Sequence, residues 1–134
     1  MESALNRTMQ PNLWPSMNGG GVEQVGATQA VNDLLCQSVN GKIHLFPGWE
    51  PHTAVSFRSI RTPGAFLVSA SRSSAGTVSG VSILSDVGGV CKLAGLKKPA
   101  VKTAADAAVA VTCDAAGHYC SFETKAKTAY EVAV

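Results

Sequence analysis

The sequence of 134 residues lacks any run of about eighteen apolar residues, which is the minimum for a membrane-spanning helix. Charged residues are scarce, at 15% of the chain against about a quarter in typical globular domains. The first residues contain no basic start followed by an apolar stretch, so we expect no secretory signal. These absences predict a chain with no membrane partner and leave its compartment open, with the cytoplasm as the default.

Basic clusters and metal-binding cysteine pairs are missing too. The net charge is +2, and Lys97-Lys98 is the only adjacent pair of basic residues after the N-terminal region, so we expect no nucleic-acid partner. The four cysteines form no CxxC motif and show no spacing with histidine that suits zinc. We therefore expect no metal site and no cofactor.

The cysteines allow one cross-link. If Ala116-Gly117 is the tip of a hairpin, Cys113 and Cys120 lie directly opposite each other, at a separation that a disulfide can span. That register makes them a hydrogen-bonded pair, in which the two strands are wider apart. A disulfide and two free thiols therefore remain alternatives.

The stretch from Gly19 to Trp49 contains the strongest helical pattern. After a triple glycine, apolar or small residues recur every three or four positions from residue 27 to residue 38, with polar residues largely opposite. This spacing predicts an amphipathic helix over residues 22–38, which Asn40-Gly41 ends. Residues 1–18 contain two prolines and no periodicity, which predicts an extended or disordered arm.

After Gly41 the apolar period changes from 3.6 to 2, and glycine, proline and serine separate short segments without helices between them. This pattern predicts a mainly β fold: an antiparallel β-sandwich of about 7–9 short strands over residues 42–134, preceded by one amphipathic α-helix. We expect residues 19–134 to form a single domain. The predicted strands cover residues 42–46, 54–60, 65–71, 77–84, 90–94, 100–103, 107–113, 119–124 and 130–134.

Few residues suggest a site. Glycine before a helix can cradle an anion, but Glu23 would repel phosphate and suits a neutral sugar better. Trp49 can stack on a sugar ring, or it can cover the end of the core. Asn18 lies near the same turn. The histidines lack a nucleophile motif, and no pair of carboxylates is defined by spacing, so we expect no catalytic residues.

The segments GGGVEQVGATQAVNDLLCQSVNGKIHLFPGWEP, AVSFRSIRTPGAFLVSAS and VSGVSILSDVGGVCKL together resemble the C-terminal region of family 95 glycoside hydrolases, the α-L-fucosidases, and their uncharacterised relatives. Such enzymes carry catalysis on an (α/α)₆ barrel that precedes a C-terminal β-sandwich. The resemblance implies the last barrel helix and the sandwich here. Glu23 is the acid nearest to the family's Asp-Gly-Asn-Phe-Gly segment, whose aspartate and asparagine are not kept.

The resemblance implies a non-catalytic accessory domain that serves as a structural or assembly module. A free-standing carbohydrate-binding module is the alternative, with Trp49, Glu23 and Asn18 at its site, and a small glycoside hydrolase is a third hypothesis. A helix that resembles a barrel helix needs a partner for its apolar face.

We therefore predict a homo-oligomer, such as a dimer, packed through helix 22–38. Light scattering coupled to gel filtration at rising protein concentration should give a mass of at least two chains. A single species with the mass of one chain at high concentration would contradict this prediction.

Overall fold

The computed structural model describes residues 21–134, with the side chains of residues 26–134. It divides the chain between Asp33 and Leu34 into two compact units, and the second, Leu34–Val134, contains both sheets. The predicted arm over residues 1–18 lies outside the described residues. No helix in the described part of the chain has the length and apolar character that crossing a bilayer requires.

The helix is shorter than the sequence predicts. Helix α2 spans Gly21–Leu35, and the chain then continues as strand β1, Cys36–Val39, which pairs with strand β2, Lys42–Leu45. Asn40 and Gly41 both have positive φ angles, 51° and 70°, as expected for the two central residues of a tight hairpin turn. The prediction of a helix over 22–38 was therefore wrong at its C-terminal end, because Asn40-Gly41 turns a hairpin and does not cap a helix.

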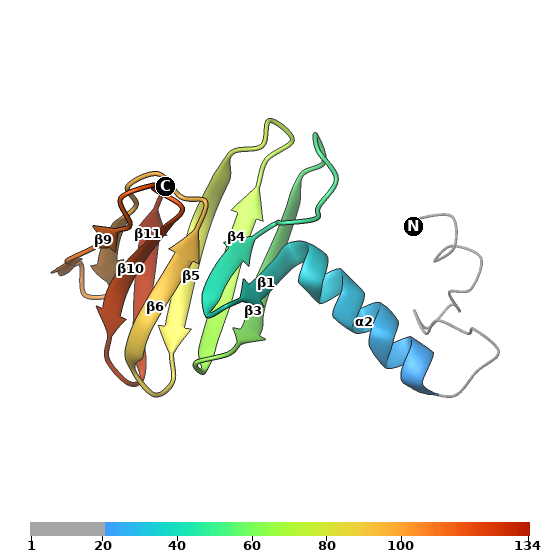
Figure 1. Cartoon of the computed structure of the whole chain (residues 1–134), viewed down its shortest axis with the longest axis horizontal. Helices are drawn as coiled ribbons and strands as arrows, with labels where there is room; N and C mark the ends of the chain where they lie inside the picture. The colour runs from blue at the N-terminus through green and yellow to red at the C-terminus, as the bar shows by residue number, and fades with distance from the viewer. Residues whose placement is uncertain (1–20) are drawn as a thin grey trace. The chain divides into compact units, whose positions relative to one another are not determined.

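Two sheets form the second unit (Figure 1). The five-stranded sheet has the order β1-β2-β6-β10-β9, and the six-stranded sheet has the order β3-β4-β5-β11-β7-β8. Neighbouring strands are antiparallel except β2 and β6, which are parallel. The further strands are β3 (Val55–Thr62), β4 (Phe66–Arg72), β5 (Val78–Ser85), β6 (Gly89–Ala94), β7 (Ala100–Thr103), β8 (Ala108–Val109), β9 (Thr112–Cys113), β10 (Tyr119–Thr124) and β11 (Thr128–Ala133).

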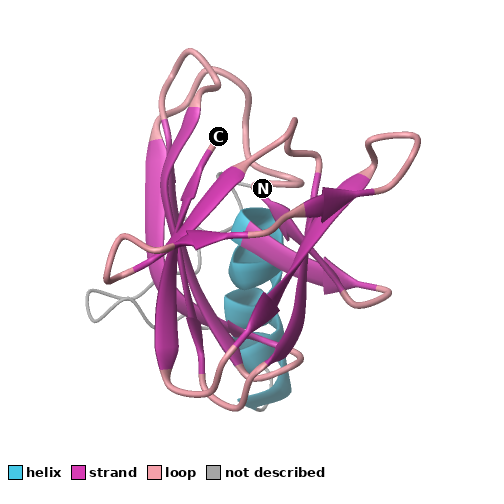
Figure 2. Cartoon of the chain, turned by 90° about the vertical axis from the view of Figure 1, so that its left-hand side faces the viewer, coloured by secondary structure: helices cyan, strands magenta, loops and turns pink. Residues whose placement is uncertain are grey.

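The predicted fold class, a mainly β sandwich preceded by one helix, is confirmed (Figure 2). The described residues contain eleven strands and not 7–9. One reason is the predicted strand 107–113, which the structure divides into β8 of the six-stranded sheet and β9 of the five-stranded sheet. The alternation of apolar residues continues through Val109 and Val111, so the sequence pattern gives no sign of this change of sheet.

The core lies between the sheets and draws on alternate residues of both. Its fully buried members include Ile43 and Leu93 from one sheet and Val68 and Ile83 from the other. Aromatic pairs add contacts of defined geometry: the ring centroids of Phe122 and Tyr130, on β10 and β11, are 5.6 Å apart. This alternation directs every second residue of each strand away from the core.

Buried hydroxyl groups link the β5–β6 connection to the β10–β11 connection. In each of these two connections the chain passes from one sheet to the other. The Thr124 hydroxyl lies 2.9 Å from Ser85 Oγ and 2.7 Å from the Gly89 carbonyl oxygen. Ser85 Oγ also accepts the Gly88 backbone N–H at 3.0 Å. Gly88 has a φ of 83°, and a Cβ there would lie 3.1 Å from backbone atoms of the other connection. We call this arrangement the double corner.

Charged groups close the double corner on its exposed side. The Asp86 carboxylate lies 3.0 Å from both Lys127 Nζ and Arg61 Nη2. The backbone N–H of Asp86 donates to the Ala65 carbonyl oxygen at 3.0 Å. The hydrogen bonds from Lys127 and then from Arg61 lower the pKa of Asp86 below its ordinary value. The corner therefore also holds the β3–β4 connection.

The β9–β10 hairpin carries a disulfide between Cys113 and Cys120, whose Cα atoms are 3.9 Å apart. The Asp114 N–H donates to the Tyr119 carbonyl oxygen at 3.0 Å, which makes Asp114 and Tyr119 the hydrogen-bonded pair of this hairpin. The cysteines are consequently a non-hydrogen-bonded pair, in which strands approach most closely. The expected hydrogen-bonded pairing was wrong, because the turn is made by Asp114–Gly117.

Replacing Thr124 by valine should destabilise the fold by about 1–3 kcal/mol, because Ser85 Oγ and the Gly89 carbonyl lose a buried partner while the volume is nearly unchanged. Urea denaturation followed by circular dichroism measures the loss. Thr112→Val, at an exposed strand position, is the matched control and should change stability by less than about 0.5 kcal/mol. Equal losses in both variants would contradict the role of the double corner.

Reducing the disulfide should lower the free energy of unfolding by about 2.5 kcal/mol, the loop-closure value for a ring of this size. Thermal unfolding with and without a phosphine reductant measures the difference. The double variant Cys113→Ser with Cys120→Ser should have the lower stability already and should not respond to the reductant. A wild-type transition that is unchanged by reduction would contradict this expectation.

Candidate ligand-binding groove

The outer face of the six-stranded sheet carries a row of polar side chains that crosses the strands. The register aligns Ser69 of β4, Ser82 of β5, Glu131 of β11 and Lys102 of β7. Their neighbours along each strand, such as Val81 and Val132, are buried in the core. The period of two in each strand therefore places these polar groups together on one surface.

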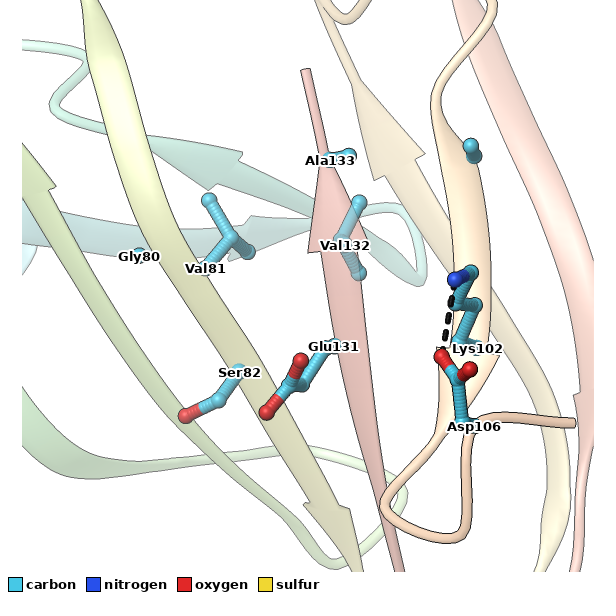
Figure 3. A pocket seen from close by; sticks show the side chains of 9 residues that line it. Gly80, Val81, Ser82, Lys102, Asp106, Glu131, Val132 and Ala133 are labelled. Carbon is cyan, nitrogen blue, oxygen red and sulfur yellow. Dashed lines mark hydrogen bonds and ion pairs between the residues drawn. The ribbon is translucent and has the colours of Figure 1, made fainter.

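Small residues next to the polar row leave a depression in this face. Ala133 of β11 and Ala100 of β7 are paired, and Gly80 of β5 has no side chain to fill the space beside them. The resulting pocket has a volume of about 510 Å³ (Figure 3). Its lining is formed by Gly80, Val81, Ser82, Ala100, Lys102, Asp106, Glu131, Val132 and Ala133.

A second hollow of about 340 Å³ continues across β4 to β3 and shares Gly80 and Ser82 with the first. Register shifts in the β3–β4 pairing, between Phe57 and Ile60, and in the β4–β5 pairing, between Ser69 and Ser71, bend the sheet here. We call the combined depression the sheet groove. The second hollow adds Ser56, Phe57, Arg58, Ser69, Ala70 and Ser71 to its lining.

The charges in the sheet groove balance. Lys102 Nζ lies 2.7 Å from Asp106 Oδ1, and this pair bounds one side (Figure 3). Glu131 and Arg58 bring one further charge of each sign, and neither forms an ion pair within the described residues. With serine hydroxyls between them, these groups offer hydrogen-bond donors and acceptors without a net field. Such a surface matches an uncharged, hydroxyl-rich ligand better than an anion.

Of the residues predicted from the sequence to bind sugar, the structure describes the side chain of Trp49, which does not line the sheet groove. Trp49 is half-buried and packs against the core cluster, and its carbonyl oxygen accepts a 3.5 Å hydrogen bond from Arg72. Its indole N–H is buried without a partner among the described residues. Asn18 and the side chain of Glu23 lie outside the described residues. Sugar binding by these three residues stays a prediction.

The described residues provide no metal cluster, since no three side chains of His, Cys, Asp or Glu there could hold an ion. Cys36 and Cys91 are buried thiols, and burial raises the pKa of Cys36 to about 11 and that of Cys91 to about 12. Both therefore stay protonated at neutral pH and are poor nucleophiles. His118 contacts Asp114 at 3.3 Å, but Asp114 serves the turn by accepting the Tyr119 N–H.

Sequence reasoning missed the sheet groove, although one signal for it was present. Serine alternates with apolar residues in the segment VSAS and recurs in the segment VSGVS, and these segments belong to the adjacent strands β4 and β5. Serine at outward positions of neighbouring strands indicates a polar face with short side chains. The contribution of Glu131 and Lys102 depends on β11 lying between β5 and β7, and that order leaves no mark in the sequence.

A comparison with models of protein families finds no match for this chain, and a comparison with curated protein sequences finds none either.

Proposed function

We propose that this chain is a non-catalytic β-sandwich module of the glycoside-hydrolase accessory type, which holds a neutral polysaccharide chain in the sheet groove. The single observation that carries the proposal is the groove itself. It is a depression across five strands, lined by hydroxyl groups and by charges of both signs that balance.

The chemistry of the groove suits sugar hydroxyls. The Glu131 carboxylate can accept hydrogen bonds from two adjacent sugar hydroxyl groups, while Ser82 and Ser71 can both donate and accept. Leu67 of β4 and Leu84 of β5 pair in the row next to the polar row, on the side of the double corner, and both are half-buried. This apolar strip suits the C–H face of a sugar ring. The two hollows adjoin at Gly80 and Ser82 and extend across the strands, so an extended chain fits better than a small molecule.

The resemblance to the C-terminal region of family 95 glycoside hydrolases supports the same proposal. In such enzymes the β-sandwich follows the catalytic barrel, and a chain with this fold would contribute binding or assembly to the enzyme.

Isothermal titration with neutral oligosaccharides, including galactosyl and fucosyl series, tests the proposal. Ala133→Phe fills the hollow and should abolish binding. Glu131→Gln removes a charged acceptor and should weaken binding about tenfold, since a hydrogen bond to a charged group contributes about 1.5–3 kcal/mol. Glu123→Gln is the matched control, because Glu123 is also exposed on a strand but belongs to the other sheet.

Binding that Ala133→Phe leaves intact would place the sugar outside the sheet groove. In that event Trp49→Ala tests the site predicted from the sequence. The proposed function would be contradicted if no neutral sugar at millimolar concentration gave a heat of binding in calorimetry or retarded the protein in affinity gel electrophoresis.

A further inference from the structure

Two lysines on the five-stranded sheet converge on one tyrosine ring. Lys42 Nζ lies 4.5 Å from the ring centroid of Tyr119, and Lys92 Nζ lies 5.9 Å from the same centroid. The three residues come from the adjacent strands β2, β6 and β10. All three flank buried residues in their strands, namely Ile43, Leu93 and Cys120, so their side chains are on the outer face.

The register makes this arrangement electrostatically unfavourable on its own. Ile43 pairs with Leu93 in the parallel β2–β6 contact, which makes Lys42 and Lys92 direct neighbours across the two strands. Like charges at such positions repel each other. The π face of Tyr119 offsets part of this repulsion through cation–π attraction.

No carboxylate among the described residues neutralises the pair. Neither lysine forms an ion pair there, and Asp114, near Tyr119 in the hairpin, is already engaged by His118 and by the Tyr119 N–H. Glu123 lies further along β10, opposite Val90, and contacts neither lysine. The cluster is therefore a local charge of +2 on a chain whose net charge is +2.

We propose that Lys42, Tyr119 and Lys92 form a binding site for the anionic group, carboxylate or sulfate, of an acidic polysaccharide. One oxyanion placed between the two ammonium groups relieves their repulsion and forms a charge-assisted hydrogen bond with each of them. The anionic group follows from the cluster alone, and the choice of a polysaccharide as its carrier rests on the proposed function. The site is on the sheet opposite the sheet groove, and the two sites take ligands of different charge.

A sugar carrier fits the cluster better than a nucleic acid does. Stacking of a base needs a free aromatic face, whereas two ammonium groups lie over the ring of Tyr119. A nucleic acid also needs a row of cations that follows its phosphates, whereas this cluster spans one anionic group. One charged sugar unit in a chain of neutral or widely spaced charges matches that size.

Affinity electrophoresis and calorimetry with polygalacturonate, dextran sulfate and uncharged dextran test the site. Lys42→Gln with Lys92→Gln should weaken binding of both acidic polymers at least tenfold and leave neutral-sugar binding unchanged. Lys97→Gln with Lys98→Gln removes the same charge from an exposed adjacent pair and is the matched control. Tyr119→Phe should keep the affinity, and Tyr119→Leu should lose several-fold. Thermal unfolding of each variant verifies that the fold is retained.

The outcomes of these binding experiments distinguish a failure of the lysine–tyrosine site from a failure of the proposed function. Loss of neutral-sugar binding in Ala133→Phe, together with retained acidic-polymer binding, supports two independent sites. Acidic-polymer binding without any neutral-sugar binding would remove the groove function and leave this site standing. The inference is overturned if the Lys42/Lys92 variant binds acidic polymers like the wild type, if the Lys97/Lys98 control loses as much affinity, if inorganic sulfate does not compete, or if a single-stranded oligonucleotide binds as tightly as the acidic polymers.

Discussion

The buried hydroxyl pair of Ser85 and Thr124 is the contact on which the arrangement of the two sheets most depends. Each residue ends a strand, and after each the chain leaves one sheet for the other. The hydrogen bonds to Gly89 and from Gly88 leave neither hydroxyl without a partner in a fully buried position. Because the two passages are fixed to each other, β11 enters the six-stranded sheet beside β5, and Glu131 is brought next to Ser82.

The two candidate sites follow from the same alternation that builds the core. In each strand the residues that do not face the core face outward, and the strand order decides which of them meet. In the six-stranded sheet this brings together short hydroxyl side chains and balanced charges. In the five-stranded sheet it brings together two lysines and a tyrosine. A sandwich with unlike outer faces can bind unlike ligands without any change in its interior.

Local patterns predicted the fold class well, because alternation and turn residues are properties of short segments. They failed at Asn40-Gly41, since the same dipeptide ends helices and turns hairpins, and only pairing of Cys36 with Leu45 distinguishes the two. They also failed at residues 107–113, where the chain changes sheet without a break in its apolar pattern. Both candidate sites needed the strand order, which depends on contacts between residues far apart in sequence. For Trp49 the sequence allowed either stacking on a sugar ring or covering the end of the core, and the residue packs against the core.

The strands at the margins of the sheets have a consequence for how the protein behaves in crowded solution. An unpaired strand edge is a template for another chain to add to, and long flat edges promote aggregation. Here β8 and β9, which end the two sheets on one side, have two residues each, and β9 is cross-linked to its neighbour by the disulfide. On the other side of the six-stranded sheet, β3 is long, but its register shift and the positive φ of Ser59 interrupt the row of hydrogen-bonding groups. These three edges therefore discourage the extension of a sheet from one molecule to the next.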